Sequence, residues 1–441
     1  MSGTSHVSIP FVKHVLDNGL VVLAHEDHRC PIVAVNIWYH VGSKDEVPGR
    51  TGFAHLFEHL MFEGSEHHDS GYFQPLQHAG AALNGSTNTD RTNYWEVVPT
   101  GALDVALWLE SDRMGYLLPA LTEAKFSTQR EVVLNERRQN YENRPYGLAT
   151  MALVGALYPP EHPYHWLTIG RPDDLRAATI DDVRAFFRRY YHPANATLAL
   201  AGDIEPEPAF RRVEAYFGAV PAGPAVAAPV QLAPPSAGDV RLVCEDNVEL
   251  PRLYLGWPSP AIFEPGDAEL DLLADVMAGG KSSRLYRTLV YQRRIATEVA
   301  AGQNSRELTS FFSVVATAAP GHALTELEQA IATEMDGLAA HGPEADELER
   351  SLVQAEANFV YRLQSVGGFG GKADQLNSYQ TYTGDPGYAE RDWLRYDQAT
   401  ADSIRRVSAD RLSCGARVAV SVVPRGRTDL ALDGSRQVTP S

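Results

Sequence analysis

The chain has 441 residues, of which 44% are hydrophobic and 21% are charged. This is the composition of a soluble globular protein, and the length predicts two or more domains. The formal net charge of −18 argues against nucleic acid and anionic membrane surfaces as partners. The three cysteines are too few and too far apart for a disulfide framework or a cysteine-based zinc site.

The N-terminal residues contain no basic region followed by an apolar run, so no signal peptide is predicted. No stretch of about 18 apolar residues is present either, so no membrane-spanning helix is expected. We therefore expect a cytoplasmic protein. A periplasmic location stays open if the sequence is that of a mature form.

An apolar segment near the N-terminus, Gly52–Phe62, contains the pattern His-x-x-Glu-His. If the segment is helical, His55 and His59 are one turn apart on the same face, and Glu58 projects close beside them. Two such imidazoles can bind zinc, and a neighbouring carboxylate can take a proton from water at the metal. The pattern is the inverted form of the zincin motif and predicts a zinc site. The alternative is a pair of core histidines with an unrelated carboxylate.

A catalytic zinc ion usually has three protein ligands, and a second predicted helix, within 127–145, offers a candidate for the third. Ser127 is the expected N-cap of this helix. Val132 and Val133 share one helical face with Glu136, so the carboxylate is expected to point toward the interior. The alternative is a surface helix with ordinary acidic residues.

The middle of the chain is a stretch rich in Pro, Ala and Gly that carries no charge. We predict a semi-rigid linker over residues 219–238. It separates an N-terminal domain, residues 1–218, from a C-terminal domain, residues 239–441, and both have a common domain size.

The two halves show the same order of predicted elements. Each begins with two apolar strands, which are Gly19–Glu26 and Pro31–Gly42 in the first half and Val240–Asp246 and Pro251–Trp257 in the second. Each later has an amphipathic helix followed by a strand, within Thr179–Ile204 and Thr400–Val423. The fold class expected is α+β, with two homologous domains, each a mostly antiparallel β-sheet flanked by several α-helices. Two unrelated α+β domains are the alternative.

The second half has no counterpart of the histidine motif. Its equivalent helix, Asp267–Met277, contains no histidine. Only the first half is therefore expected to carry the metal site.

With these motifs the chain resembles the pitrilysin/insulinase family of zinc metallopeptidases. Glu136 follows His59 by 77 residues, the separation at which that family places its ligand glutamate. The resemblance extends over essentially the whole chain and includes Leu83–Trp95, Val132–Gly147 and Gly279–Leu289. It is most specific in the first half.

The resemblance implies a zinc-dependent endopeptidase that binds one Zn²⁺ per chain. The implied metal ligands are His55, His59 and Glu136, and the implied general base is Glu58. The other implied site residues are Phe62, which lines the site, Asn84 and Gly85, which lie in a strand that binds the substrate main chain, and Gln129, which would orient a metal ligand. For Asn84 and Gly85 a hairpin turn is the alternative, because Asn-Gly is also a strong turn signal.

Two departures from the family pattern are visible. Gln129 stands where the family has an acidic residue, and Val290 and Thr297 stand where complete members have an Arg/Tyr pair that binds the substrate backbone. The resemblance therefore implies a heterodimer with a homologous subunit that carries the Arg/Tyr pair, enclosing peptides or unfolded polypeptides in a chamber. The alternatives are a non-catalytic core or scaffold subunit of the same fold and a self-sufficient homodimeric peptidase.

Overall fold

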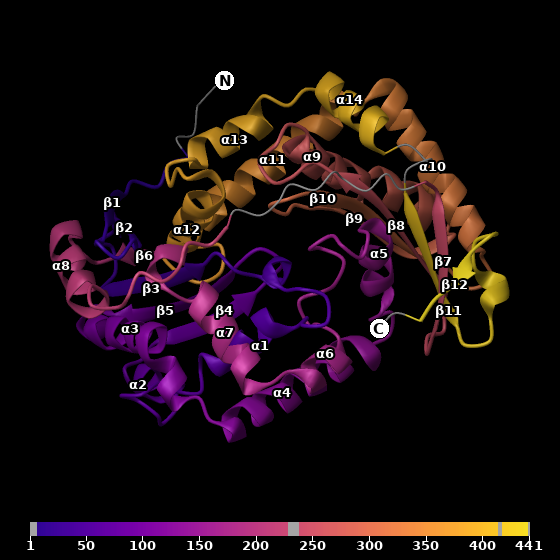
Figure 1. The fold of residues 1–441 in the computed structure, drawn as a ribbon. Helices are drawn as coiled ribbons and strands as arrows, with labels where there is room; N and C mark the ends of the chain where they lie inside the picture. The colour runs from indigo at the N-terminus through magenta and orange to yellow at the C-terminus, as the bar shows by residue number, and fades with distance from the viewer. Residues whose placement is uncertain (1–6, 228–237, 413–416, 440–441) are drawn as a thin grey trace. The chain divides into compact units, whose positions relative to one another are not determined.

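The computed structural model describes residues 7–227, 238–412 and 417–439, and these form two six-stranded sheets with helices packed on them (Figure 1). The chain divides into two compact units. The first unit comprises Met1–Asn135, Thr168–Pro229 and Asn358–Trp393, and the second comprises Glu136–Leu167, Val230–Ala357 and Leu394–Ser441. Each unit is therefore built from separate stretches of sequence.

The first sheet has the strand order β1-β2-β6-β3-β5-β4, which places β4 at an edge. Its strands are β1 (Val12–Val15), β2 (Val21–Glu26), β3 (Ile32–Tyr39), β4 (Ala82–Thr87), β5 (Thr92–Pro99) and β6 (Ala196–Gly202). Only β2 and β6 are parallel, and the other neighbouring pairs are antiparallel.

The second sheet has the order β12-β7-β11-β8-β10-β9. Its strands are β7 (Val240–Asp246), β8 (Arg252–Ser259), β9 (Ala296–Asn304), β10 (Ser310–Ala318), β11 (Val418–Pro424) and β12 (Arg436–Gln437). Here β12 and β11 both run parallel to β7, and the remaining pairs are antiparallel.

Five strands of the two sheets correspond one to one. The order β2-β6-β3-β5-β4 in the first sheet repeats as β7-β11-β8-β10-β9 in the second. In the first sheet β6 lies between β2 and β3, and it runs parallel to β2 and antiparallel to β3. In the second sheet β11 lies between β7 and β8 in the same way. The predicted fold class and the predicted duplication are confirmed.

The helices of the first unit lie on both faces of its sheet. They are α1 (Phe53–Leu60), α2 (Phe73–His78), α3 (Leu103–Ala120), α6 (Pro172–Ala177), α7 (Ile180–Tyr190), α8 (Pro206–Phe217) and α12 (Lys372–Thr383), with most of α4 (Glu123–Arg137). Helices α1 and α3 pack on the face that carries Tyr94 and Glu96. Helix α12 packs on the opposite face, where Ala373 and Leu376 contact Ala34.

The second unit contains α5 (Ala149–Leu157), α9 (Asp267–Ala278), α10 (Leu324–His341) and α14 (Ala401–Arg411), whereas α11 (Ala345–Arg362) and α13 (Ala389–Asp397) are shared between the units. Short 3₁₀ or π turns are η1 (Ser43–Asp45), η2 (Thr100–Ala102), η3 (Arg138–Glu142), η4 (Pro193–Asn195), η5 (Tyr286–Gln292) and η6 (Thr428–Leu430). Helix α5 packs on β7, β8 and β11 of the second sheet, around Leu153 and Val420.

The two halves of the sequence thus exchange a helix. Helix α5 comes from the first half but covers the second sheet, and α12 comes from the second half but covers the first sheet. The predicted boundaries, 1–218 and 239–441, therefore separate the two sheets but not the compact units. Residues 228–237 of the predicted linker 219–238 lie outside the described residues.

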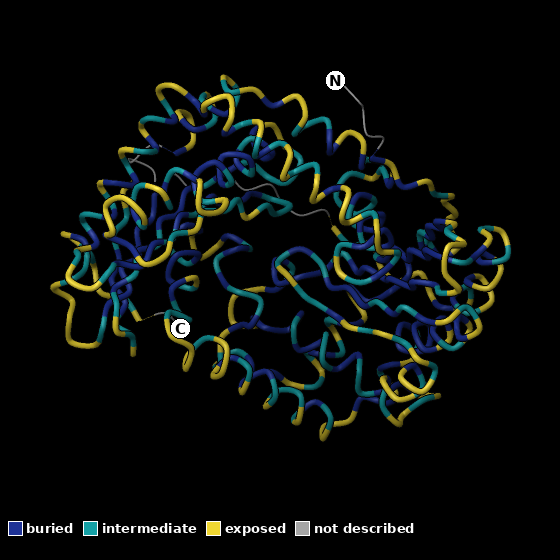
Figure 2. Tube along the Cα trace, turned by 180° about the vertical axis from the view of Figure 1, so that it is seen from behind, coloured by how far each residue is buried: buried dark blue, intermediate teal, exposed yellow. Residues whose placement is uncertain are grey.

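Buried residues follow the strands, and the surrounding helices alternate between buried and exposed positions (Figure 2). This alternation is the pattern of amphipathic helices that cover a sheet. Within the described ranges, no helix combines the length and the apolar character needed to cross a membrane.

Candidate metal centre

The His-x-x-Glu-His segment forms α1, as predicted. One face of the helix is buried, and there Phe57 packs on the aromatic rings of α7, 5.5 Å from the ring centroid of Phe186. The other face carries His55, Glu58 and His59, all half-buried. The two imidazole rings lie edge to face with centroids 4.9 Å apart, so they occupy one turn of the same helical face.

The beginning of α1 is held by a buried carboxylate, Glu46. Its Oε2 accepts a hydrogen bond from the Gly52 N–H at 2.9 Å, and its Oε1 accepts one from the Ala54 N–H at 2.8 Å. These amides belong to the first turn, where no intrahelical acceptor exists, and a negative charge at this end is also favoured by the helix dipole. Glu46 was not identified from the sequence, because it lies six residues before the first amide it binds.

We expect Glu46→Ala to loosen the start of α1. Losing a buried cap costs about 1–2 kcal/mol, so hydrogen exchange at the Gly52 and Ala54 amides should become roughly 5- to 30-fold faster. Glu207→Ala is the matched control, because Glu207 is an exposed acidic residue in the first turn of α8. Equal exchange rates in the wild type and Glu46→Ala would contradict the capping role.

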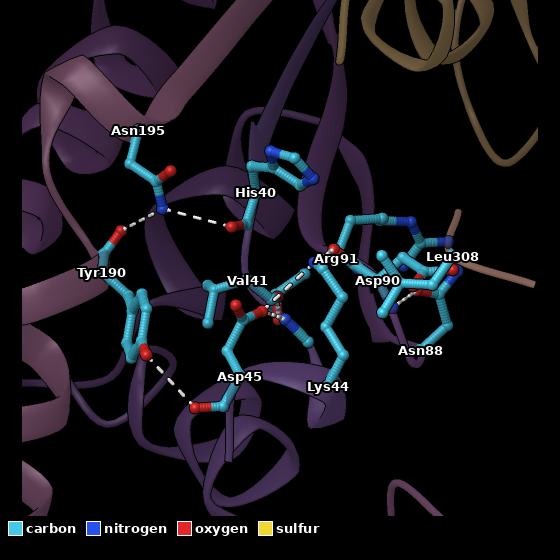
Figure 3. A network of polar contacts seen from close by, with 12 residues as sticks. His40, Val41, Lys44, Asp45, Asn88, Asp90, Arg91, Tyr190, Asn195 and Leu308 are labelled. Carbon is cyan, nitrogen blue, oxygen red and sulfur yellow. Dashed lines mark hydrogen bonds and ion pairs between the residues drawn. The ribbon is translucent and has the colours of Figure 1, made fainter. Parts of the chain in front are cut away.

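The segment that carries Glu46 is itself fixed by polar contacts (Figure 3). The buried Lys44 donates from Nζ to the backbone carbonyl of Asp90, in the turn between β4 and β5, at 2.7 Å. The Tyr190 hydroxyl of α7 donates to the backbone carbonyl of Asp45 at 3.1 Å. One segment therefore ties α1 to both the β4–β5 hairpin and α7.

The predicted second helix is α4, but it begins earlier than expected. It starts at Glu123, and the Thr122 hydroxyl accepts a hydrogen bond from the Lys125 N–H at 3.3 Å. The prediction of Ser127 as N-cap is wrong, because Thr122 already supplies this contact one turn earlier. The helix is unbroken through Glu136 and ends in a π-helical turn.

The structure brings His55, His59 and Glu136 together. One ligand atom from each lies within 4.8 Å of the other two. Although Glu136 is the first residue of a stretch that belongs to the second unit, α4 is continuous, so this residue is carried by the same helix as the buried Val133. In the described part of the chain, no other three His, Cys, Asp or Glu side chains form a comparable cluster.

The donor set fits zinc. Two imidazoles and one carboxylate are a ligand combination that catalytic zinc sites use, with a further position left open. Burial, and secondarily the neighbouring His59, lowers the pKa of His55 to about 4. The His55 imidazole is therefore neutral at pH 7, which is the state that coordinates a metal.

Glu58 lies in the same turn of α1 as the two histidines. Its carboxylate is near the buried phenols of Tyr94 and Tyr191. Burial raises the pKa of both phenols above the usual range, and the charge on Glu58 adds to this effect. Both phenols therefore stay protonated at neutral pH beside the Glu58 carboxylate.

The Asn84–Gly85 pair lies in β4 and not in a hairpin turn, because the turn follows at Asn88–Arg91, where the Asn88 N–H donates to the Arg91 carbonyl at 3.0 Å. Gly85 is buried, and a Cβ atom there would lie 3.1 Å from the ring of Phe62. Asn84 is exposed, and its Oδ1 accepts the Gly85 N–H at 2.8 Å. The predicted edge strand is confirmed, and glycine is required there for close packing.

Phe62 packs near a buried arginine, Arg113, that was not identified from the sequence. The Arg113 guanidinium lies 3.9 Å from the ring centroid of Tyr72 and 5.3 Å from that of Phe62. It also donates from Nε to Glu110 at 2.9 Å. No local pattern marks its role, because the aromatic partners Phe62 and Tyr72 lie in a separate part of the chain.

Gln129 lies on α4, two turns before Glu136, and its Nε2 donates to Oε1 of Glu63 at 2.5 Å. Glu63 follows His59 by four residues. The amide thus links α4 to the segment after α1 by a hydrogen bond. A carboxylate at position 129 would instead face the like charge of Glu63.

The second half has neither a metal cluster nor the Arg/Tyr pair in its described residues. Val290 lies in η5 and packs against the apolar core of the second unit. Thr297 lies on β9, where its hydroxyl donates to the Thr317 carbonyl at 3.4 Å. Neither position offers a guanidinium or a phenol.

Two family models match the chain. The model described as "Insulinase (Peptidase family M16)" matches residues 21–161, and the one described as "Peptidase M16 inactive domain" matches residues 177–354. The first match contains His55, Glu58, His59 and Glu136. The second contains α9, the helix without a histidine.

Comparisons with individual proteins indicate the same family of peptidases. The chain is 30% identical to the zinc protease PqqE of Helicobacter pylori over 83% of each chain. It superposes on the crystal structure of a protease from Helicobacter pylori with a TM-score of 0.86 and 26% identity, covering 94% of this chain and 100% of that chain. It also superposes on the periplasmic protease PqqL from Escherichia coli with a TM-score of 0.78 and 18% identity, covering 97% of this chain but 49% of that chain.

Proposed function

Because the chain belongs to peptidase family M16, the insulinase family, we propose that it is a zinc-dependent endopeptidase subunit that hydrolyses peptides or unfolded polypeptides. The observation that carries the proposal is the convergence of His55, His59 and Glu136 within 4.8 Å. Glu58 lies in the same helical turn, so a candidate base is next to the candidate metal ligands.

Each residue of the proposed site has its own chemical role. The imidazoles of His55 and His59 and the carboxylate of Glu136 hold the metal. Zinc, when bound, supplies Lewis acidity toward the scissile carbonyl and toward water. The Glu58 carboxylate takes a proton from the attacking water and delivers it to the nitrogen of the leaving amine.

The edge strand β4 positions the substrate. An extended peptide can add to such an edge through main-chain hydrogen bonds, and side-chain pockets then give specificity. Asn84 and Gly85 supply this edge beside Phe62, which follows the metal-binding turn. The need for an extended main chain favours peptides and unfolded segments over folded proteins.

We further propose that the active assembly is a heterodimer. The chain spans about half the length of PqqL, a protease with the same fold. Val290 and Thr297 leave this half without the residues implied to bind the substrate backbone, so a homologous subunit must supply them. A non-catalytic role is disfavoured because His55, His59, Glu136 and Glu58 are all present together.

Purified protein should hold about one zinc ion per chain, and Glu136→Gln should lose most of it, because an amide is a much weaker zinc ligand than a carboxylate. Elemental analysis after dialysis measures this. Glu131→Gln is the matched control, since Glu131 is an exposed residue of the same helix. Unchanged zinc content in Glu136→Gln would remove Glu136 from the ligand set.

A further inference from the structure

The edge strand β4 has two sides, and the metal centre occupies only one of them. Side chains of a strand alternate between the faces of its sheet. Gly85 faces Phe62 and Tyr94 on the side of α1. Asn84 therefore faces the other side, where α12 packs, and its partner across the strand pair is Trp95.

An exposed aromatic side chain lies beside this second side. Phe369 is 51% exposed, and its ring meets that of Trp95 edge to face, with centroids 5.5 Å apart and an interplanar angle of 86°. Both residues belong to the first compact unit. An apolar surface thus adjoins β4 on the face opposite the metal centre.

Phe369 is at the tip of a glycine-rich loop, Gly367–Gly371, that lies tightly on the sheet. A Cβ atom on Gly367 would lie 2.6 Å from side-chain atoms of Ala34 and Val97. The residues on either side of Phe369, Gly368 and Gly370, have φ angles of +81° and +74°, which other residues rarely adopt. The loop conformation therefore depends on its glycines.

A carboxylate of α12 helps to hold this loop in place. Asp374, in the first turn of α12, accepts the Gly370 N–H through Oδ2 at 2.8 Å. Its Oδ1 accepts hydrogen bonds from Trp38 Nε1 at 2.9 Å and from the side-chain amides of Asn36 and Asn93 at 3.2 Å each. A loop fixed in this way can present an aromatic ring without a further ordering cost on binding.

A cavity adjoins this surface on the same face. It has a volume of about 490 Å³, and its lining includes Val97, Val366 and Gly367 together with the charged residues Asp27 and Arg29. Val97 is the next residue of β5 on the face of Trp95, and it pairs with Ala82 of β4. The aromatic pair and the cavity therefore lie next to successive residues of the edge strand, the pair at Asn84 and the cavity at Ala82.

The opposite face also carries an aromatic pair. Phe73 of α2 is 40% exposed and stacks on Phe62 with ring centroids 4.6 Å apart. A peptide strand added to β4 would direct consecutive side chains to opposite faces, one toward Phe62 and Phe73 and the next toward Trp95 and Phe369.

We propose that Phe369 and Trp95 form a second substrate subsite, which binds a bulky apolar side chain on the face opposite the metal centre. The inference rests on the proposed function. It specifies the substrate class as extended segments with bulky apolar residues at adjacent positions. Such segments are buried in folded proteins and become accessible on unfolding.

The test compares two labelled peptides, one with adjacent phenylalanines and one with the two phenylalanines separated by one residue, in the same soluble background. Only the adjacent pair can occupy both faces, whatever the register of the peptide on β4. Binding is measured by fluorescence anisotropy with zinc-loaded full-length Glu58→Gln protein assembled with the homologous subunit. The heterodimer is the proposed active species, and this variant of it cannot consume the peptide. The adjacent pair should bind about 3- to 10-fold more tightly, the range of one aromatic contact.

Adding Phe369→Ala should remove this preference and leave the affinity for the separated pair unchanged, whereas Phe369→Leu should retain part of it. Val353→Ala, which alters an exposed apolar residue of α11, is the control and should change nothing. An undiminished preference in Phe369→Ala overturns the subsite alone. If the zinc-loaded assembly binds neither peptide, the subsite and the proposed substrate site both fail.

Discussion

Glu58→Gln should keep zinc and the fold but lose peptide hydrolysis by about 100- to 10,000-fold, the usual contribution of a general base. Glutamine has nearly the same size as glutamate but cannot accept the proton from water. Because the metal ligands in this account are His55, His59 and Glu136, the substitution leaves zinc binding intact. Turnover of a fluorogenic peptide by the assembled enzyme, together with the zinc content, measures both effects.

Glu66→Gln is the control for this experiment, since Glu66 is an exposed residue shortly after α1. It should change neither zinc content nor turnover. Substantial residual hydrolysis in Glu58→Gln would assign the base to another residue. Loss of zinc in the same variant would instead make Glu58 a structural group or a ligand.

The chain alone should be nearly inactive, and a homologous chain with the Arg/Tyr pair and without His-x-x-Glu-His should restore activity. A homodimer would contain two metal centres and no residues to hold the substrate backbone, because Val290 and Thr297 occupy those positions. Each positioned donor for the developing oxyanion is commonly worth about a factor of 100 to 1,000 in rate. Mixing the two chains should therefore raise kcat/KM by at least about that factor.

The measurement is a titration of this chain with the homologous chain at fixed zinc and peptide concentrations. Activity should saturate at one partner per chain. A partner in which the arginine and tyrosine are replaced by valine and threonine is the matched control and should not activate. Full activity from this chain alone, at any concentration, would contradict the heterodimer.

A local sequence pattern was sufficient for the metal-binding helix, because the spacing of His55 and His59 indicates a shared helical face. The edge strand at Asn84 and Gly85 was implied by the family resemblance, since the local pattern also allowed a hairpin turn. The duplicated order of strands and helices likewise predicted two related sheets. For the metal-binding helix the information lies within a few residues of the feature itself.

The features that were missed depend on contacts between distant segments. A periodic pattern shows which face of a helix is buried but not which sheet buries it, so the exchange of α5 and α12 was not predicted. For the same reason the proposed subsite at Phe369, in the second half of the sequence, could not be assigned to the first sheet. Glu46 and Arg113 likewise act on partners that their neighbours in sequence do not indicate.

We propose that His55, His59 and Glu136 hold one zinc ion next to Glu58. A crystal of the purified protein, with anomalous diffraction recorded on both sides of the zinc absorption edge, locates the metal. We expect one anomalous peak per chain, about 2.0–2.2 Å from a nitrogen of each imidazole and from a carboxylate oxygen of Glu136. A zinc-containing protein with no peak at these three side chains, or with its peak at other residues, would contradict it.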